Sequence, residues 1–323
     1  MLNTRSLFFA LILLTTLLFA GCVGITGDDS EQPAYAYGEE IDIDIHGLIS
    51  RVTYRDNAAY IFGSMHMGRA SWYPLHDQVE AAMRRADVFA FETDISPDAQ
   101  AEHATLAAPY MFLEDGTTLS DFLPPDIYEA FSETLDTYNV QREVLGPFTP
   151  WAISLLLMEL TADAIGISPA YSVDFYVMGF ALEQGLPILG LNPLAHEVSL
   201  AFHLSEELQR YAALALQDFD SATQQMGALT AAYEAQNIPQ ILYFTRESIA
   251  AEEETPLTRY MIDVLHIQRS VEFAQEIIRL LQETEDATTF FVSMGIGHLV
   301  GDDHGNVFRY LAEAGFEIVP LYR

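Results

Sequence analysis

The stretch YIFGSMHMG, residues 60–68, is an apolar run that meets a glycine at Gly63 and a histidine, His66, three positions later. The stretch VSMGIGHLVG, near the other end of the chain, repeats this order with Gly295 and His298. Glycine adopts backbone angles that other residues avoid, so each stretch predicts a strand that ends at a sharp turn and presents a histidine. Open α/β sheets bind ligands at the carboxyl ends of their strands, so the pair suggests a functional site. For each histidine alone, a structural role in the core is the simpler interpretation.

Composition limits the possible functions. The chain has 323 residues, half of them apolar, which is enough to form a substantial core. The formal net charge is −33, and all 14 basic residues are arginines. A surface of this sign repels nucleic acid and anionic lipid headgroups, so binding of polyanions is excluded.

The N-terminus predicts export. In residues 1–21, Arg5 precedes an uncharged apolar run, as in a signal peptide, and LLFAGC resembles the lipobox of bacterial lipoproteins. We expect Cys22 to be lipidated, residues 22–40 to be a flexible tether, and residues 41–323 to form one α/β domain. The protein would then be lipid-anchored to a bacterial membrane on its periplasmic or extracellular side. An ordinary signal peptide with an incidental cysteine is the alternative, and the single cysteine excludes internal disulfides.

The rest of the chain predicts strands near both ends and helices in the middle. We therefore expect an α/β fold whose central, mostly parallel mixed sheet is built from both chain ends, with a long helical insertion between them. The expected strands are residues 45–54 and 59–65, which form a hairpin, and 87–92, 187–191, 288–294 and 316–320. The expected helices are residues 75–86, 125–138, 150–165, 172–184 and 304–314, and most of 196–284 with a break near 237–239.

Glu92 adds a carboxylate to the two imidazoles, because it ends another apolar run, VFAFE. A buried carboxylate is costly unless a cation, a metal ion or a hydrogen-bond network compensates it. His66, Glu92 and His298 are therefore candidate ligands for Zn²⁺, Mn²⁺, Co²⁺ or Fe²⁺. Such an ion can lower the pKa of bound water to about 7. The alternative is that Glu92 caps a loop or helix through hydrogen bonds.

The layout resembles the TraB/GumN/Tiki family of exported or membrane-anchored, metalloprotease-like proteins. The resemblance is carried by FGSMHMG, ADVFAFETD, FTPWA, SVDFYVMGFALEQGLPILGL and GIGHLVG. It implies a fold akin to erythromycin esterase and to haem-binding lipoproteins, with His66, Glu92 and His298 as metal or catalytic residues. It also implies that Arg269 stabilises an oxyanion or holds Glu92, and that Asp174 supports the ligands.

Two positions depart from the family pattern. Asn192 stands where a glutamate is common, and Ser270 replaces the usual asparagine. An amide cannot act as a base or a charged ligand, so Asn192 is expected only to support the site. Gly297 joins Gly63 and Gly295 as glycines that are expected to shape the two histidine loops.

The remaining histidines are interpreted as ordinary. His304, with Asp302 and Asp303, could add metal ligands, but an exposed acidic loop is the simpler interpretation. The chain has no G-x-S-x-G, P-loop, dinucleotide or H-E-x-x-H motif. The histidines predicted to lie at the surface are His76, His103, His196, His203 and His266.

These observations predict a metal-dependent hydrolase that acts on peptides or proteins. Glu92 could instead be a general base beside a two-histidine metal site. A second hypothesis is a metal-free hydrolase with His66 as its base. A third is a non-catalytic lipoprotein that binds a metal, haem or a peptide, which Asn192 and Ser270 favour. All versions of the shared site require His66 and His298, 232 positions apart, to lie within a few ångströms of each other.

Overall fold

The computed structural model describes residues 48–114, 116–137, 142–215, 219–247, 255–301 and 305–321. The predicted signal peptide, the tether with Cys22, the expected domain start at Ile41 and the loop residues 302–304 lie outside these ranges. Within the described ranges, no helix is long and apolar enough to cross a bilayer.

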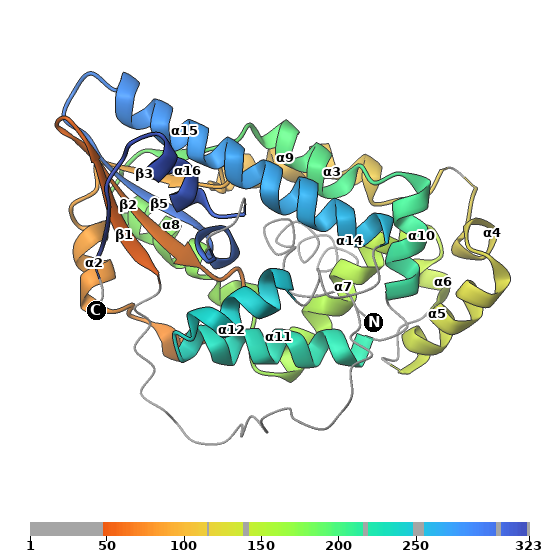
Figure 1. Cartoon of the computed structure of the whole chain (residues 1–323). Coiled ribbons are helices and arrows are strands. Elements are labelled where there is room, and N and C mark those ends of the chain that lie inside the picture. Colours follow the sequence, from red (N-terminus) through yellow and green to blue (C-terminus); the bar gives the residue numbers. More distant parts are fainter. Residues whose placement is uncertain are drawn as a thin grey trace.

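A six-stranded mixed sheet forms one end of the molecule (Figure 1). The strand order is β4-β3-β5-β2-β1-β6. Strands β2, β3, β4 and β5 run parallel to one another, and β1 runs antiparallel to both of its neighbours. This arrangement confirms the expected fold class, because β2 and β5, from opposite ends of the chain, pair at the centre of the sheet. The strands are β1 (Ile49–Tyr54), β2 (Asn57–Ser64), β3 (Val88–Phe91), β4 (Ile188–Gly190), β5 (Thr289–Gly295) and β6 (Ile318–Pro320).

The β1–β2 hairpin turns through Arg55 and Asp56, two residues fewer than predicted. Arg55 adopts a left-handed conformation with φ 53°. Asn57 belongs to β2 because its side chain holds the hairpin against the C-terminal part of the chain. The Asn57 amide donates to the carbonyl of Thr284, and its oxygen accepts from the backbone N–H of Thr288.

Helices cover the sheet and form the other end of the molecule (Figure 1). Helix α8 packs against β3 and β5, and α15 packs against β1, β2 and α16. The α-helices are α2 (Asp77–Met83), α3 (Pro97–Ala107), α4 (Leu119–Phe122), α5 (Pro125–Thr137), α6 (Arg142–Leu145), α7 (Pro150–Ala164), α8 (Val173–Glu183), α9 (Leu194–Phe202), α10 (Glu206–Ala215), α11 (Phe219–Glu234), α12 (Ile238–Leu242), α14 (Pro256–Tyr260), α15 (Arg269–Glu283) and α16 (Val307–Glu313). Short 3₁₀-helices are η2 (Ala70–Trp72), η3 (Ala108–Tyr110), η4 (Pro169–Tyr171) and η8 (Ile296–Leu299), and π-helices are η6 (Tyr243–Glu247) and η7 (Met261–Gln268).

Gly63 does not end a strand, so this expectation is wrong. It lies within β2, where it pairs with Met294 of β5. Gly63, Gly295 and Gly297 are also absent from the glycines with positive φ, so none of them provides a left-handed turn. A Cβ atom on Gly63 would lie 2.3 Å from Cδ1 of Ile296. The glycine is needed here because it allows the segment that follows β5 to pack closely against β2.

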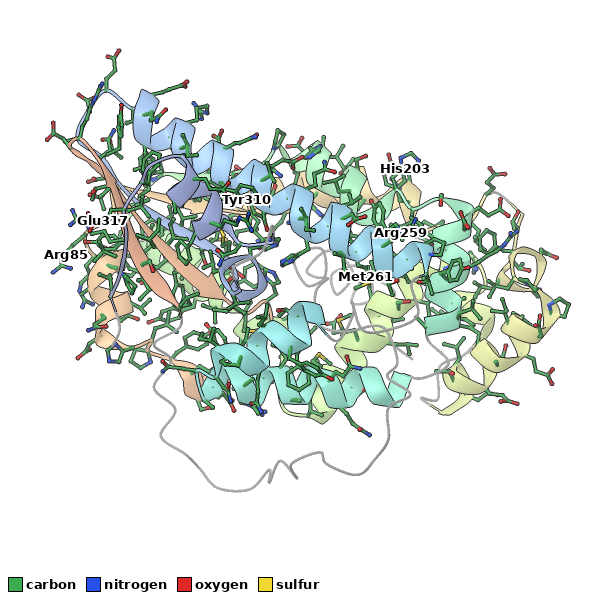
Figure 2. All side chains as sticks on the ribbon, viewed as in Figure 1. Arg85, His203, Arg259, Met261, Tyr310 and Glu317 are labelled. Carbon is green, nitrogen blue, oxygen red and sulfur yellow. The ribbon has the colours of Figure 1, made fainter. Side chains whose placement is uncertain are left out.

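The described residues form a sheet core, a helical core and a third, smaller cluster that includes Phe131 of α5. In the sheet core, the ring of Phe291 on β5 contacts Phe62 on β2 and Phe89 on β3. The helical core includes Trp151 and Phe202. Figure 2 shows the side chains at both ends of the molecule, with Arg85 and Glu317 at the sheet end and His203 and Arg259 at the helical end.

His103 is buried in the helical part, contrary to the expected surface position. Only 5% of its surface is exposed, because α3 turns it towards Phe202 of α9, which it meets edge-on at 5.8 Å. Its Nδ1 has no hydrogen-bond partner among the described residues. Burial lowers the pKa of His103 from 6.5 to about 4.

Replacing His103 should therefore change how stability depends on pH. Below pH 6.5 the unfolded chain binds a proton that the folded chain excludes down to about pH 4, so His103 lowers the stability of the wild type as the pH falls. His103→Leu should not show this loss. The free energy of unfolding of the variant, relative to that of the wild type, should therefore be about 2 kcal/mol higher at pH 5 than at pH 7.5. Urea unfolding at both pH values measures the difference. His203→Leu, at an exposed position, is the control, and equal pH dependence in both variants would contradict the assignment.

Candidate functional site

Three neighbouring parallel strands deliver the candidate residues to one edge of the sheet. His66 follows β2, Glu92 follows β3 directly, and His298 lies in η8 directly after β5. Nε2 of His66 lies 3.9 Å from Oε1 of Glu92, and Nε2 of His298 lies 4.0 Å from the same oxygen. The structure therefore places the two distant histidines around a single carboxylate oxygen.

Gly295 makes room for this arrangement. A Cβ atom on Gly295 would lie 3.2 Å from both Oε1 of Glu92 and Nε2 of His66, and 3.8 Å from Cδ2 of His298. Those distances are at or below ordinary van der Waals contact, so a side chain here would press into the space between the three groups. Gly297 is less restrictive, because its Cβ would meet Thr245 and His266 at 3.4 and 3.5 Å.

Asp174 orients His66 from behind. Nδ1 of His66 lies 2.8 Å from Oδ2 of Asp174, and Oδ1 of Asp174 accepts a hydrogen bond from Ser293. A carboxylate accepts the proton of Nδ1, which leaves the lone pair of Nε2 on the side of Glu92. Burial opposes a charge on His66, but the hydrogen bond and charge of Asp174, with the charge of Glu92, raise the pKa of His66 overall.

Ser270 orients His298 in a comparable way. The Ser270 hydroxyl donates to the carbonyl of Gly305, so it accepts the hydrogen bond from Nδ1 of His298 at 2.7 Å. The Nε2 atom of neutral His298 then carries a lone pair. The His298 ring is also held by Phe273, which meets it edge-on at 5.2 Å, and by His266, which stacks on it at 4.6 Å. The serine thus supplies a polar partner at the position where the family pattern has asparagine.

Arg269 and a backbone amide hold Glu92. Oε2 of Glu92 lies 2.6 Å from Nη2 of Arg269, and Oε1 accepts the N–H of Gly295 at 2.7 Å. Burial alone would raise the pKa of Glu92, but the charges of Arg269 and His66 and these hydrogen bonds outweigh it and lower the pKa. Glu92 is therefore a carboxylate anion at neutral pH.

A second carboxylate, Glu197, shares Arg269. Oε2 of Glu197 lies 2.7 Å from the same Nη2 atom. The amide of Asn192 donates to Oε1 of Glu197 and to Glu272, at 2.7 and 2.9 Å. Asn192 therefore supports the site through Glu197, which is a charged partner of Arg269.

The charges buried at the site do not balance. Glu92, Asp174 and Glu197 are each 4–6% exposed, and Arg269 is 6% exposed. Three carboxylates and one guanidinium leave two negative charges when the histidines are neutral. Uncompensated buried charge is costly, so the site favours a further positive charge, either a proton on His66, whose pKa is raised, or a bound cation.

The donor set suits a divalent metal ion. Two imidazole nitrogens and a carboxylate oxygen are ligands of first-row metals, and a carboxylate behind a histidine is typical of such ligands. Bonds of about 2.0–2.2 Å place neighbouring ligand atoms roughly 3.0–3.5 Å apart, so the separations of 3.9 and 4.0 Å must shorten by about 0.4–1.0 Å to hold an ion. As the side chains stand, no group of three or more His, Cys, Asp or Glu in the described part of the chain is close enough to hold a metal ion.

The sequence missed several residues of the site. His266 was expected at the surface, but it is 3% exposed and lies against His298. Its position three residues before Arg269, on one face of a helical segment, was the available signal. Glu197 could have been noticed as an acid next to the apolar positions of α9. Nε2 of His196 lies 3.0 Å from Oε2 of Glu272, so His196 contacts a partner of Asn192 and none of the three proposed ligands.

Comparison with known proteins identifies the family of the chain. The TraB/PrgY/gumN family pattern matches residues 48–320, which include every candidate described above except Cys22. The chain belongs to the TraB/PrgY/gumN family.

The individual relatives of this family member are distant. The uncharacterized protein YbaP of Shigella flexneri is 19% identical over 149 residues, which are 46% of this chain and 53% of YbaP. YbaP of Escherichia coli K12 is 19% identical over 148 residues, with the same coverage. The chain thus spans about half the length of the curated relatives that it matches. No solved structure matches it.

Removing Arg269 should destabilise the protein strongly. Arg269→Met leaves Glu92 and Glu197 buried without their cation, which costs about 3–5 kcal/mol. The loss of unfolding free energy should be smaller at pH 5 than at pH 7.5, because the unpaired carboxylates take up protons at the lower pH. Arg279→Met is the control on the same helix, since Arg279 is half exposed and pairs with Glu276 and Glu283, which are 22% and 65% exposed. Its cost should stay within about 1 kcal/mol. Equal unfolding free energies for both variants would contradict the buried ion pair.

Neutralising Asp174 should lower the pKa of His66. Asp174→Asn removes the negative charge that favours the imidazolium and replaces one of the two carboxylate oxygens by an NH2 group, while keeping the size of the side chain. NMR titration of the histidine Cε1–H signals in chelator-treated protein measures the shift, with His203 as the internal control. An unchanged pKa of His66 would show that Asp174 does not orient this ring.

Proposed function

We propose that this chain is a metal-dependent hydrolase that acts on peptides, with His66, Glu92 and His298 as the metal ligands. The observation that carries the proposal is that both Nε2 atoms lie within 4.0 Å of the same Glu92 oxygen. The excess of buried negative charge supports a divalent cation at this point. The peptide substrate class rests on the resemblance of the sequence to metalloprotease-like proteins.

Each residue of the site has a role in this proposal. Asp174 and Ser270 keep protons on the Nδ1 atoms, so that both Nε2 lone pairs face Glu92. Arg269 and the N–H of Gly295 keep Glu92 ionised and fixed. A bound divalent ion would supply a Lewis acid that polarises a substrate carbonyl and lowers the pKa of water. The fixed side chains reduce the reorganisation that the reaction requires.

A metal-free hydrolase is the second candidate, and the 2.8 Å contact between His66 and Asp174 favours it. A histidine whose Nδ1 proton is held by a carboxylate can accept a proton at Nε2 as a general base. The raised pKa of His66 fits this role. In this version Glu92 stabilises the imidazolium that forms.

Metal content separates the two candidates. Protein without a histidine tag is stripped of metal with a chelator and then loaded in separate samples with Zn²⁺, Mn²⁺, Co²⁺ or Fe²⁺. After desalting, the metal bound per chain is measured by inductively coupled plasma mass spectrometry. The wild type should retain about one ion per chain. His66→Ala and His298→Ala should lose it, and His203→Ala, outside the site, should keep it. This comparison also removes the contribution of ions that adhere to the acidic surface.

Activity on a peptide library completes the test. Hydrolysis that appears with the metal and disappears in both site variants supports the metal-dependent enzyme. Activity of the stripped protein that needs His66 supports the metal-free hydrolase and overturns the first proposal. Stoichiometric metal without any hydrolysis would identify a binding protein instead.

A further inference from the structure

A small cavity adjoins the candidate site, between the sheet core and the helical core. His66, Gly295 and His298 form part of its wall. Methionines from both cores form much of the rest, with Met65 from the sheet core and Met67 and Met226 from the helical core. The further lining residues are Ser64, Met158, Ile167, Leu229, Thr245, His266, Ile296 and Gly297.

The size of the cavity suits a short aliphatic group. Its volume is ≈ 50 Å³, on the scale on which one water molecule needs about 10–15 Å³. This is room for roughly three to five non-hydrogen atoms. The side chains of valine and leucine have this size, whereas an aromatic ring is larger.

The chemistry of the wall points the same way. Among the described residues that line the cavity, none is an Asp, Glu or Arg. A charged side chain that entered would lose its hydration without meeting an oppositely charged Asp, Glu or Arg side chain in the wall, which costs several kcal/mol. Methionine side chains are flexible and polarisable, so they fit closely around branched aliphatic groups.

Ser64 supplies a polar contact at this apolar wall. It is 1% exposed, and its Oγ has no hydrogen-bond partner in the described part of the chain. A buried hydroxyl without a partner costs about 1–3 kcal/mol, so an isolated structural role does not explain it. An amide group of a bound ligand would satisfy it.

We propose that this cavity is a specificity pocket that takes a valine- or leucine-sized side chain of the substrate, while Ser64 binds an adjacent backbone amide. The inference rests on the proposed function, because the pocket selects a substrate only if the adjoining histidine site acts on one. The size and polarity of the cavity exclude aromatic and charged side chains.

Binding can be tested without hydrolysis. Full-length protein carrying ¹³C-methyl methionine is titrated with N-acetyl methylamides of valine, leucine, glycine and phenylalanine, and the methionine signals are followed by NMR. The valine and leucine probes should shift the signals of Met226 and Met158, leave Met111 unchanged, and bind about tenfold more tightly than the other two probes. Equal shifts with all four probes, or none, would overturn the pocket.

Widening the cavity provides the matched comparison. Met226→Ala should improve binding of the phenylalanine probe about tenfold relative to valine. Met111→Ala removes an equally buried methionine of the helical core that does not line the cavity, and it should leave the preference unchanged. If both variants changed the preference equally, a general loosening of the helical core would explain the preference, and the pocket would not.

Ser64→Ala tests the polar contact. It should maintain or raise thermal stability, because it removes an unsatisfied hydroxyl, and yet weaken binding of the valine probe about fivefold. Unchanged binding would overturn the role of Ser64. Selective binding without hydrolysis of any peptide would support the pocket and contradict the proposed hydrolase. Hydrolysis without any side-chain preference would support the hydrolase and contradict the pocket.

Discussion

The buried ion triad of Arg269 with Glu92 and Glu197 is the interaction on which the rest of the site depends. One guanidinium nitrogen lies 2.6 and 2.7 Å from the two carboxylates and so links the end of β3, the start of α9 and the start of α15. Without the cation, Glu92 could not remain ionised between two imidazoles in a buried setting. The triad also leaves the site negative, since Asp174 is not neutralised by it. This residual charge is the physical reason to expect a further cation beside Glu92.

The parallel pairing of β2, β3 and β5 fixes the positions of the side chains around this ion triad. The strands end at one edge of the sheet, so His66, Glu92 and His298 need no long loops to meet. Partners from different parts of the chain then fix each ring, with Asp174 of α8 behind His66 and Ser270 of α15 behind His298. Gly295 contributes by having no side chain. The apolar cavity lies against the same histidines, so the proposed specificity pocket adjoins the polar centre.

Much of the fold and the heart of the site could be predicted from the sequence. Strand periodicity located the sheet, and the repeated glycine–histidine pattern identified His66 and His298. Glu92 was predicted because a carboxylate at the end of an apolar strand needs compensation. Local patterns could not reveal why Gly63 is glycine, because its constraint is contact with Ile296, more than 200 residues away. They also could not reveal that His103 and His266 are buried, or that Glu197 shares Arg269, because helix packing in three dimensions decides these.

The central claim is that His66, Glu92 and His298 converge to bind a single cation. It is tested most directly by a crystal structure of the metal-loaded protein, with anomalous scattering recorded on both sides of the absorption edge of the metal. The account predicts one strong anomalous peak about 2.0–2.2 Å from Nε2 of His66, Nε2 of His298 and a carboxylate oxygen of Glu92. Strong metal peaks only elsewhere on the molecule, with the two Nε2 atoms still 3.9 and 4.0 Å from Oε1 of Glu92, would contradict it.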